Sequence, residues 1–461
     1  MTTVLLRSGE LREIETRHAG DTPPLMERAG RAAAMLAQRL AGRRGRVLVC
    51  AGPGNNGGDA RVMARQLRSA GLGVEVVGAG DPISPGDYAL VVDGLFGIGL
   101  TRPLAGPYAQ LVERINAFRG PVLALDVPSG IDGDSGRVLG CAVRASHTIS
   151  FIGGKPGLYT LDGPDHSGAI GVDNLGLDLA GYPGALLDVA DFAAQLRPRR
   201  RNSHKGHFGS LAVIGGAPGM TGAALLAARA GLQLGAGRVF AGLLQPLAVD
   251  PVQPELMLRT PDDALAAATT VVAGPGLGTG DAALACLRRI VADELPLVLD
   301  ADALNLLATH PVLARQVALR ATATLLTPHP AEAARLLSVD VASVQADRVA
   351  AAIELARRFR AQVALKGCGT VLAGPDGRWR INSTGNAGLA SAGSGDVLAG
   401  IAGALLAQGW PADMALAAAV HLHGAAADAA AGAGAGPVGL AAGELIPFAR
   451  TQLNRLIAAH A

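Results

Sequence analysis

The sequence predicts an α/β protein with two tandem domains, each built on a sheet with helices on both faces. The chain has 461 residues, which is too long for one ordinary hydrophobic core. Strand-like apolar runs alternate with helical patterns in both halves, and this alternation is typical of parallel sheets covered by helices. Near residues 195–207 the composition changes to proline and basic residues, as at a domain boundary. We therefore expect domains at residues 1–200 and 201–461.

The first half shows the alternation clearly. It should contain helices at residues 10–18, 25–40, 60–71 and 104–118, and strands at residues 46–51, 73–80, 88–97 and 121–130. Pro23 and Pro24 mark the break before the second helix. Polar residues follow three of the strands, and loops after the carboxyl ends of parallel strands are where such sheets bind ligands.

The second half restarts with a strand and a Gly-rich loop, followed by a helix at 224–237. Further strands are expected at residues 238–244, 269–274, 296–304, 323–330 and 361–374. The Ala/Gly tract at 424–443 reads as a helix of small residues followed by a loop.

The composition excludes several classes of protein. Hydrophobic residues make up 49% and charged residues 17%, so there is ample material for two cores. A net charge of +2 and an aromatic content of 3% argue against a nucleic-acid partner. The four cysteines are scattered without a CxxC pair, which indicates a reducing compartment. Neither a signal peptide nor an apolar run long enough for a membrane is expected, so we predict a cytoplasmic protein.

The most informative stretch is residues 386–400, NAGLASAGSGDVLAG. A Gly-rich turn that leads into a helix leaves backbone N–H groups unpaired, and together with the helix dipole they form an anion site. Asp396 would lie at this helix start. It could be an ordinary helix cap, or it could accept a proton from a hydroxyl that attacks a phosphorus atom.

A second Gly-rich turn follows the first strand. Gly52, Gly54 and Gly57 match the spacing of the dinucleotide-binding fingerprint. However, Asp59 would lie in the first helical turn and repel a pyrophosphate, which argues against an NAD-dependent dehydrogenase. Asn55 and Asn56 with the glycines suit a polar ligand or a hard cation instead. The sequence contains no GxxxxGK[ST] motif, so a P-loop nucleotide site is not expected.

These motifs in series resemble a known family. The segments GPGNNGGDA (52–60), VVDGLFGIGL (91–100) and ALDVPSGIDGDSG (124–136) resemble the NAD(P)H-hydrate epimerase domain, a Rossmann-like three-layer sandwich. KGHFGSLAVIGG (205–216), GPGLG (274–278), TPHPAE (327–332), KGCGT (366–370) and NAGLASAGSGD (386–396) resemble the ribokinase-like, ADP-dependent NAD(P)H-hydrate dehydratase domain. Their order over nearly the whole chain is similar to that of the bifunctional bacterial NAD(P)H-hydrate repair enzymes.

The resemblance implies site residues in the first domain. The hydrated nucleotide would contact Asn55, Asn56, Gly57, Gly58, Asp59 and Asp126, and be covered by the loop Gly97, Ile98, Gly99, Leu100, Thr101, Arg102 and Pro103. Asp126 would be catalytic. Potassium would be held by Asn56, Asp93 and Ser129. Ala60 departs from the family pattern, where glycine is commoner. From the residues alone, Asp93 and Asp126 could equally be structural caps.

In the second domain the resemblance places an adenine nucleotide, ADP with Mg²⁺, against Lys366, Gly367, Cys368, Gly369, Thr370 and Gly395. The hydrate would contact Ala223, Gly278, His329 and Asp396. Asp396 would deprotonate the C6 hydroxyl of the hydrated nicotinamide for phosphoryl transfer. His329 could instead fasten its own loop, and Lys205 could either position phosphate or belong to the solvated linker.

The function implied is metabolite repair. One domain would interconvert the R and S hydrates of NADH and NADPH, and the other would dehydrate the S hydrate with release of AMP and phosphate, in a chain that forms a homo-oligomer. Two alternatives stay open. The second domain could be a small-molecule kinase with the same aspartate base, or the first domain could be a binding module without catalysis.

Overall fold

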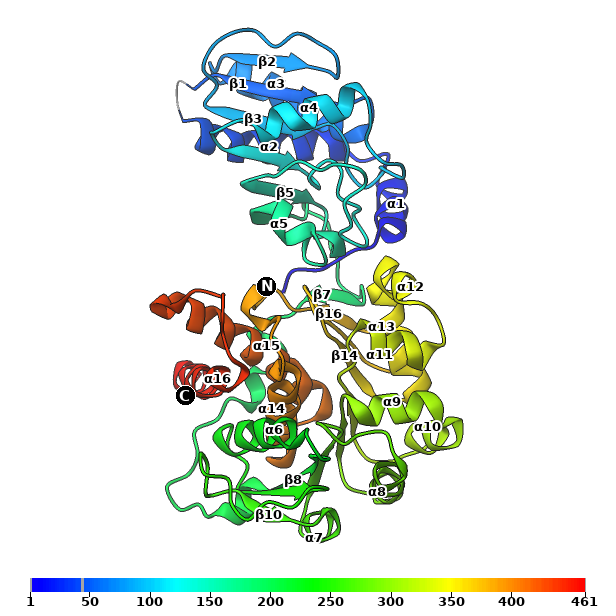
Figure 1. Cartoon of the computed structure of the whole chain (residues 1–461). Coiled ribbons are helices and arrows are strands. Elements are labelled where there is room, and N and C mark those ends of the chain that lie inside the picture. The colour runs from blue at the N-terminus through cyan, green and yellow to red at the C-terminus, as the bar shows by residue number, and fades with distance from the viewer. Residues whose placement is uncertain (1, 43–44, 461) are drawn as a thin grey trace. The chain divides into compact units, whose positions relative to one another are not determined.

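The structure is a computed structural model that describes residues 2–42 and 45–460. It divides into two compact units, Met1–Leu186 and Leu187–Ala461 (Figure 1). The expected domain ends at residues 1 and 461 lie outside the described residues. The units divide earlier than the predicted boundary at 200/201, because Phe192 and Leu196 are buried in the core of the second unit.

The first unit is a parallel sheet with strands in the order β2-β1-β3-β4-β5-β6. The strands of this sheet are β1 (Val47–Ala51), β2 (Val74–Val77), β3 (Leu90–Gly94), β4 (Val122–Leu125), β5 (His147–Phe151) and β6 (Ala169–Asp173). The short strand β7 (Gly184–Leu186) lies at the end of the unit and outside this sheet. Its helices are α1 (Ser8–Arg17), α2 (Leu25–Ala41), α3 (Asn55–Ser69), α4 (Pro107–Asn116) and α5 (Gly163–Ser167), with a 3-10 turn η1 (Pro156–Leu158).

Both faces of the central strands β1, β3 and β4 are buried, as the sequence predicts. Along β1, Val47 and Val49 belong to the core shared with α2 and α3, whereas Leu48 and Cys50 belong to the core shared with α4. Because successive side chains of a strand point to opposite faces, this alternation produces three layers. The predicted three-layer α/β sandwich is confirmed.

The second unit is a mixed sheet with the order β10-β9-β8-β11-β12-β13-β14-β15-β16. The strands are β8 (Ser210–Gly215), β9 (Arg238–Leu243), β10 (Met257–Arg259), β11 (Thr270–Ala273), β12 (Leu297–Leu299), β13 (Thr324–Leu326), β14 (Gln362–Leu365), β15 (Val371–Ala373) and β16 (Trp379–Ile381). The pairs from β10 to β14 are parallel, and β15 and β16 are antiparallel. The single strand predicted at 361–374 is wrong: a turn at 366–370 reverses the chain between β14 and β15.

Helices cover the second sheet. They are α6 (Thr221–Gln233), α7 (Pro261–Ala266), α8 (Asp281–Ala292), α9 (Asp302–Thr309), α10 (Pro311–Ala318), α11 (Pro330–Leu337), α12 (Val341–Ala346), α13 (Arg348–Phe359), α14 (Ser394–Ala407), α15 (Ala412–Ala430) and α16 (Ala442–Ala459). Short turns are η2 (Val189–Asp191), η3 (Ala193–Gln195), η4 (Lys205–Phe208), η5 (Ala387–Leu389) and the π-helical η6 (Ala431–Ala435).

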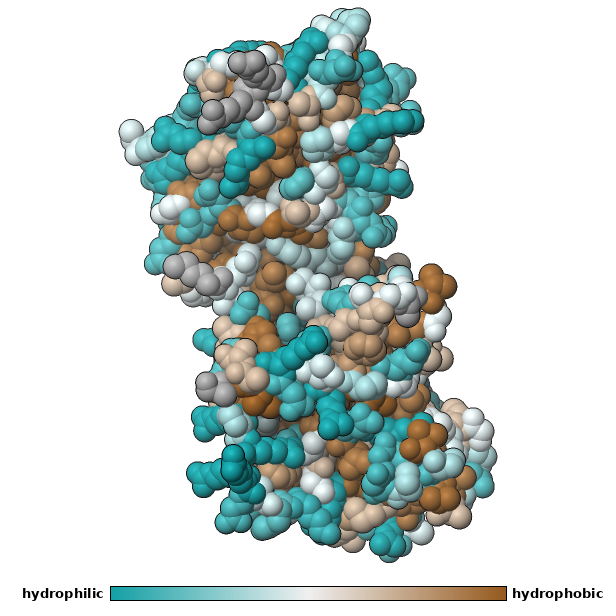
Figure 2. Space-filling view, turned by 90° about the vertical axis from the view of Figure 1, so that its left-hand side faces the viewer, coloured by the Kyte–Doolittle hydropathy of each residue, from teal (hydrophilic) through white to brown (hydrophobic). Residues whose placement is uncertain are grey.

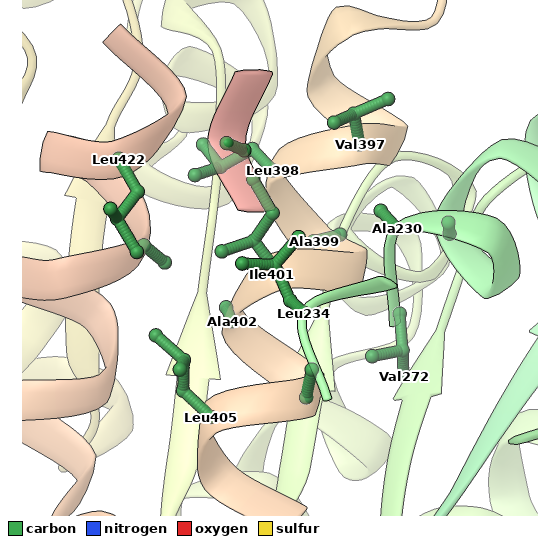
Figure 3. Packing of buried hydrophobic residues seen from close by; sticks show 14 of the residues in the cluster. Ala230, Leu234, Val272, Val397, Leu398, Ala399, Ile401, Ala402, Leu405 and Leu422 are labelled. Carbon is green, nitrogen blue, oxygen red and sulfur yellow. The ribbon is translucent and has the colours of Figure 1, made fainter. Parts of the chain in front are cut away.

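Helix α14 is the centre of the second core. Its side chains from Val397 to Leu406 are buried and pack against α6, α15 and the sheet, as Figure 3 shows for Ala230, Val272 and Leu422. A helix that is apolar on all sides must be enclosed, and here the small side chains allow close packing. The burial of α14 fixes its amino-terminal turn in position.

The surface is polar with scattered apolar residues. Figure 2 shows hydrophilic and hydrophobic side chains mixed on one face. Exposed large apolar side chains such as Leu319 and Val438 come from separate elements. Among the described residues, every helix is too short or too polar to cross a membrane.

The division of the core leads to a first prediction. A fragment of residues 187–461 should unfold at a higher urea concentration than one of residues 201–461, because the shorter fragment lacks Phe192 and Leu196. Loss of a buried aromatic side chain alone costs about 3–5 kcal/mol. Equal urea midpoints for the two fragments would show that the segment 187–200 contributes nothing to this core. The double variant Phe192→Ala and Leu196→Ala in the longer fragment is the matched control and should reproduce the loss.

Candidate active sites

A cavity of about 650 Å³ opens at the carboxyl ends of the strands in the first unit. Parallel strands present their following loops at one edge, which explains why residues far apart in sequence meet there. Predicted site residues that line the cavity are Asn55, Asn56, Asp59, Gly97, Ile98, Gly99, Leu100 and Asp126. Those outside the described lining are Gly57, Gly58, Thr101, Arg102 and Pro103. Gly57 serves packing, since a Cβ there would lie 1.9 Å from the carbonyl oxygen of Gly52.

Asp126 is the residue directly after β4, and it forms an ion pair with Lys155. The Lys155 side chain is only 2% exposed. Its ammonium also donates to the Ser150 hydroxyl at 3.0 Å and to the carbonyl oxygens of Phe151 at 2.7 Å and Gly153 at 3.1 Å. The ammonium is therefore held by the loop after β5 and directed at one oxygen of Asp126.

Two further carboxyl groups line the cavity. Burial and the negative charges of Asp126 and Glu15 raise the pKa of Asp59 to about 8. Burial, followed by the charge of Asp126, also raises the pKa of Glu15 on α1. Asp59 thus holds a proton at neutral pH, whereas Asp126 has an ammonium partner.

Beneath the cavity, Asp93 and Ser129 are buried and joined. Asp93 accepts hydrogen bonds from the Ser129 hydroxyl at 2.6 Å and the Ser129 backbone N–H at 2.7 Å. Burial raises the pKa of Asp93 to about 6, although the bonds from Ser129 oppose the shift. Asn56 is also buried, and neither atom of its side-chain amide has a hydrogen-bond partner among the described residues.

In the second unit the candidate site lies at the amino terminus of α14. Gly393 precedes this helix with a φ of 89°. A Cβ on Gly395 would lie 3.2 Å from the Lys366 ammonium, so the ammonium lies against the first helical turn. Unpaired N–H groups, the helix dipole and a lysine together favour an anion at this position.

Asp396 shares this turn, and its environment is anionic. Burial and the charges of Asp300 and Asp302 raise the pKa of Asp396 to about 7, while Lys366 opposes the shift. A carboxyl group with a pKa near neutrality can accept a proton and release it again, as a general base must. The arrangement goes beyond that of a simple helix cap, because burial and the neighbouring charges of Asp300, Lys366 and Asp302 all act on the Asp396 carboxyl group.

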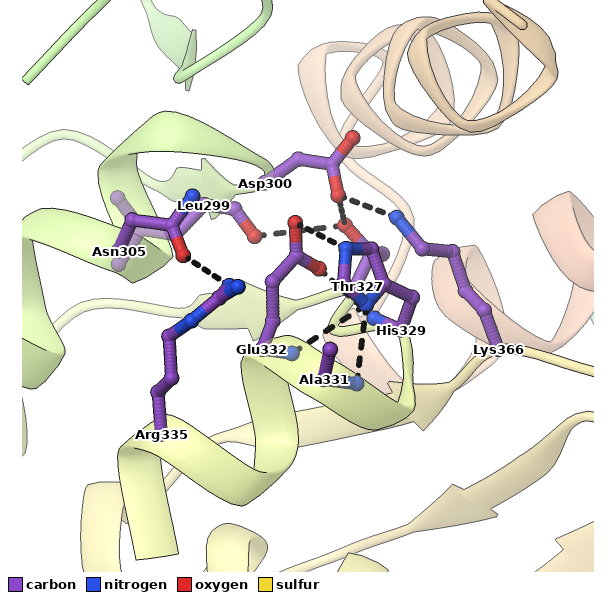
Figure 4. A network of polar contacts seen from close by, with 9 residues as sticks. All are labelled: Leu299, Asp300, Asn305, Thr327, His329, Ala331, Glu332, Arg335 and Lys366. Carbon is purple, nitrogen blue, oxygen red and sulfur yellow. Dashed lines mark hydrogen bonds and ion pairs between the residues drawn. The ribbon is translucent and has the colours of Figure 1, made fainter. Parts of the chain in front are cut away.

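Lys366 is fixed by a buried aspartate. Its ammonium donates to Asp300 at 2.7 Å, and the Thr327 hydroxyl donates to the same oxygen at 2.9 Å (Figure 4). Burial lowers the pKa of Lys366, but Asp300, Glu332 and Asp396 outweigh it and the pKa is raised overall. The lysine therefore stays charged.

His329 caps helix α11. Its Nδ1 accepts from the N–H of Ala331 at 3.1 Å and of Glu332 at 3.3 Å, and its Nε2 pairs with the Glu332 carboxylate at 3.2 Å (Figure 4). Burial and Lys366 lower the pKa of His329. The ring is used to fasten its own loop, and its side chain is still 46% exposed.

The turn from Lys366 to Thr370 is supported by a buried arginine. Arg348 at the start of α13 donates to the carbonyl oxygens of Leu365 at 3.1 Å and of Lys366 and Gly369 at 3.3 Å. Burial lowers the pKa of Arg348 to about 10. The Arg348 guanidinium thus fixes the backbone of the segment that is predicted to bind the nucleotide.

Ala223 and Gly278 are brought close by the loop before α6. A Cβ atom added at Gly278 would lie 3.8 Å from the Met220 side chain. The backbone N–H of Ala223 donates to the carbonyl oxygen of the same Met220. The N–H of Gly278 donates to Asp302 at 2.8 Å. Since the charge of Asp302 acts on Asp396, the two predicted contacts belong to the same region.

Sequence reasoning missed three residues of these sites. Asp300 follows a strand and carries the same signal as Asp93 and Asp126, so it could have been found. Lys155 is a lone lysine in a Gly- and Pro-rich segment directly after an apolar run, which is a weaker signal. Arg348 has none, because its neighbours on α13 suggest only a solvated helix.

Two family models match the chain. Residues 211–446 match the model described as NAD(P)H-hydrate dehydratase, and residues 23–85 and 80–157 match the YjeF-related protein N-terminus. The bifunctional NAD(P)H-hydrate repair enzyme Nnr of Coxiella burnetii is 39% identical over 98% of this chain and 100% of its own length. The ADP-dependent (S)-NAD(P)H-hydrate dehydratase of Neisseria meningitidis is 50% identical over 58% of this chain and 92% of its own length.

A solved structure resembles the second unit. The ADP/ATP-dependent NAD(P)H-hydrate dehydratase of Bacillus subtilis, crystallised with ATP and Mg²⁺, has 31% identity and a TM-score of 0.52. The match covers 60% of this chain and 98% of that protein.

Proposed function

The chain belongs to the family of bifunctional NAD(P)H-hydrate repair enzymes, and we propose that its two candidate sites divide the two reactions between them. The protein is an NAD(P)H-hydrate epimerase and an ADP-dependent (S)-NAD(P)H-hydrate dehydratase. The first site interconverts the R and S hydrates, and the second restores NAD(P)H from the S hydrate. Assembly of copies and a cytoplasmic location stay predictions.

The cavity of the first unit supports the epimerase assignment. It is large enough for a hydrated nicotinamide and carries ionisable groups on several walls. Asp126 is the catalytic residue in this proposal, and Gly97–Leu100 and Asn55 line the space in which the substrate would bind. A binding module without catalysis needs neither the ion pair at Asp126 nor a carboxyl group at Asp59 that keeps its proton up to about pH 8.

Potassium would bind Asn56, Asp93 and Ser129. These side chains fit an alkali cation because they offer an amide, a carboxylate and a hydroxyl oxygen, and because the buried Asn56 amide has no partner among the described residues. A bound cation would neutralise Asp93 and hold together the start of α3, the end of β3 and the loop after β4. Its contribution is to order the walls of the cavity.

The potassium proposal predicts a metal signal in crystals. Soaking with rubidium should give an anomalous peak beside Asn56, Asp93 and Ser129, with oxygen distances somewhat longer than the roughly 2.3–2.6 Å of calcium. The variant Asn56→Leu should lose the peak, whereas Asp81→Asn, a change in an exposed loop of the same unit, should keep it. Absence of the peak in wild-type crystals at high rubidium concentration would contradict the site.

The turn at α14 supports the dehydratase assignment. Gly395 and Lys366 offer positive charge to a phosphate, and Asp396 lies beside them with a pKa near neutrality. In the reaction, Asp396 takes the proton of the C6 hydroxyl, and that oxygen attacks the terminal phosphorus of ADP. The lysine and the backbone N–H groups stabilise the charge that develops on the phosphoryl oxygens. AMP leaves as its bond to the attacked phosphorus breaks. Phosphate then leaves C6 as the lone pair of the ring nitrogen forms a C=N⁺ bond, and loss of a proton from C5 to water restores the ring double bond.

The nucleotide would lie along the segment Lys366, Gly367, Cys368, Gly369 and Thr370. Mg²⁺ is expected with it, since the Bacillus subtilis relative was crystallised with ATP and Mg²⁺. Ala223, Gly278 and His329 would contact the hydrate. The Nδ1 atom of His329 already accepts hydrogen bonds from the backbone of α11. The exposed part of its ring would therefore contact the hydrate as part of the wall of the site.

One experiment tests both assignments. Purified protein is incubated with mixed R and S hydrates, and the two epimers are separated by chromatography while absorbance of the reduced nicotinamide is followed. Without nucleotide, an excess of either epimer should relax to the equilibrium mixture. With ADP and Mg²⁺, absorbance should recover and both epimers should disappear. A stable phosphorylated product would identify a kinase instead, and unchanged epimer ratios would reject the epimerase.

A further inference from the structure

Four ionisable side chains from four segments line the cavity of the first unit. Glu15 comes from α1, Asp59 from α3, Asp126 from the end of β4 and Lys155 from the loop after β5. Arg12 of α1 and His18, directly after that helix, are the other charged or titratable groups of the described lining. Three carboxyl groups face one buried ammonium, so a proton on one of them relieves the repulsion.

Lys155 determines which oxygen of Asp126 is free. Its ammonium has three N–H donors and contacts four oxygens, so it is fixed in position. It contacts Oδ1 of Asp126, and the N–H of Phe151 donates to the same oxygen at 3.4 Å. The other oxygen, Oδ2, lies 3.1 Å from where a Cβ on Gly97 would stand. Since Gly97 lines the cavity, Oδ2 is left for a ligand.

Asp59 has the opposite environment. The charges of Asp126 and Glu15 add to burial and raise its pKa to about 8, and Lys155 offsets only part of the shift. Asp59 and Asp126 thus share one cavity in different environments: burial and like charges favour the protonated form of Asp59, whereas Asp126 is paired with an ammonium. Such a contrast suits an acid and a base.

We propose that Asp59 and Asp126 are the acid–base pair of the epimerisation, and that Lys155 is the positioning residue that makes Asp126 the base. The inference rests on the proposed epimerase function of this cavity. It extends that function by giving Asp59 a catalytic role and Lys155 a supporting one.

The reaction needs one proton donor and one acceptor. Asp59 donates its proton to the C6 hydroxyl, the C6–O bond breaks, and the lone pair of the ring nitrogen forms a C=N⁺ bond as water leaves. A water molecule then adds to the opposite face of C6, Asp126 takes its proton, and the electron pair of the C=N⁺ bond returns to nitrogen. Transfer of one proton from Asp126 back to Asp59 through water restores the starting state.

The test compares Asp59→Asn with the wild type in the full chain, without nucleotide. The amide has the same shape but no proton to give. We expect epimerisation kcat to fall by about 10²–10⁴, with a much smaller change in KM. In the wild type, kcat/KM should decline above about pH 8, where Asp59 loses its proton, and this decline should be absent from the residual activity of the variant. The urea unfolding transition of a fragment of residues 1–186 that carries the same change serves as the folding control, because dehydratase activity reports only on the second unit.

Glu15→Gln is the matched control variant. It removes one negative charge from the same cavity, so the decline in kcat/KM should move to lower pH instead of vanishing. Lys155→Met should lower kcat and change KM much less, because Lys155 contacts Oδ1 of Asp126 and not the oxygen that is left for the ligand. If Lys155→Met does not fold, the Asp59 and Glu15 variants still decide the proposal.

The outcomes separate two failures. If the wild type does not relax an excess of one epimer, the epimerase function itself is wrong. If the wild type epimerises and Asp59→Asn keeps its kcat and its decline above about pH 8, the acid role of Asp59 is wrong and the epimerase function stands. A rise in KM alone would make Asp59 a binding residue and likewise overturn the pair.

Discussion

Asp396→Asn is expected to reduce ADP-dependent dehydration of the S hydrate by about 10²–10⁴, the range typical of a lost general base. The fold should persist, because asparagine has the same shape as aspartate and the buried side chains of α14 begin only at Val397. Nucleotide binding should persist as well, since Lys366 and the backbone of the turn are unchanged. Recovery of reduced-nicotinamide absorbance with S hydrate, ADP and Mg²⁺ measures the effect.

The pH dependence gives a second readout for Asp396. A base must be ionised to accept a proton, and the pKa of Asp396 is raised to about 7. Wild-type kcat/KM for dehydration should therefore rise with pH through about 7 and level off above it. Asp262→Asn, the same change in an exposed ion pair of the same unit, is the control and should behave like the wild type. Near wild-type dehydration by Asp396→Asn would leave Asp396 with a structural role only.

Asp126→Asn is expected to leave R hydrate behind when ADP-driven repair goes to completion. The first unit would lose its base, with a loss of about 10²–10⁴ in epimerisation, while the second unit would still consume S hydrate. The amide oxygen can still accept from Lys155, and Lys155 keeps its bonds to Ser150, Phe151 and Gly153, so the loop should hold. Slow spontaneous epimerisation sets the remaining rate.

Chromatography of the residual hydrate decides this prediction. Asp81→Asn, which changes an exposed loop carboxylate of the first unit, should clear both epimers like the wild type. If Asp126→Asn also clears R hydrate at the wild-type rate, Asp126 is a structural cap. A variant that loses dehydration too would indicate damage beyond the first site and would be checked by its unfolding transition.

The alternation of strands and helices was sufficient to predict both α/β sheets, because burial on both faces leaves continuous apolar runs such as residues 47–51 and 270–273. It failed where strands are short or partly exposed. Strand β6, with only intermediate and exposed residues, was not predicted. The buried strand β5 was missed as well, because polar residues interrupt its apolar run. The antiparallel pair β14 and β15 was read as one strand, although Gly367 and Gly369 lie in the turn between them.

For the candidate sites, the sequence by itself was sufficient to predict which residues carry the chemistry. The glycines, the aspartate and the helix start at 386–400 predict an anion site, because local spacing determines which groups a turn can present. Polar residues that follow parallel strands predict that a ligand binds at that edge of the sheet. Asp396, Asp93 and Asp126 were predicted as site residues in this way.

Only the tertiary structure decided the partners and the charge state of these residues. Lys155 reaches Asp126 from the next strand, and Asp300 reaches Lys366 from β12 to β14, across contacts that no local pattern encodes. The raised pKa values of Asp59 and Asp396 depend on burial and on charges from other segments. Because electrostatic interactions act through space in a medium of low polarity, their strength is determined by the folded arrangement and not by position along the chain.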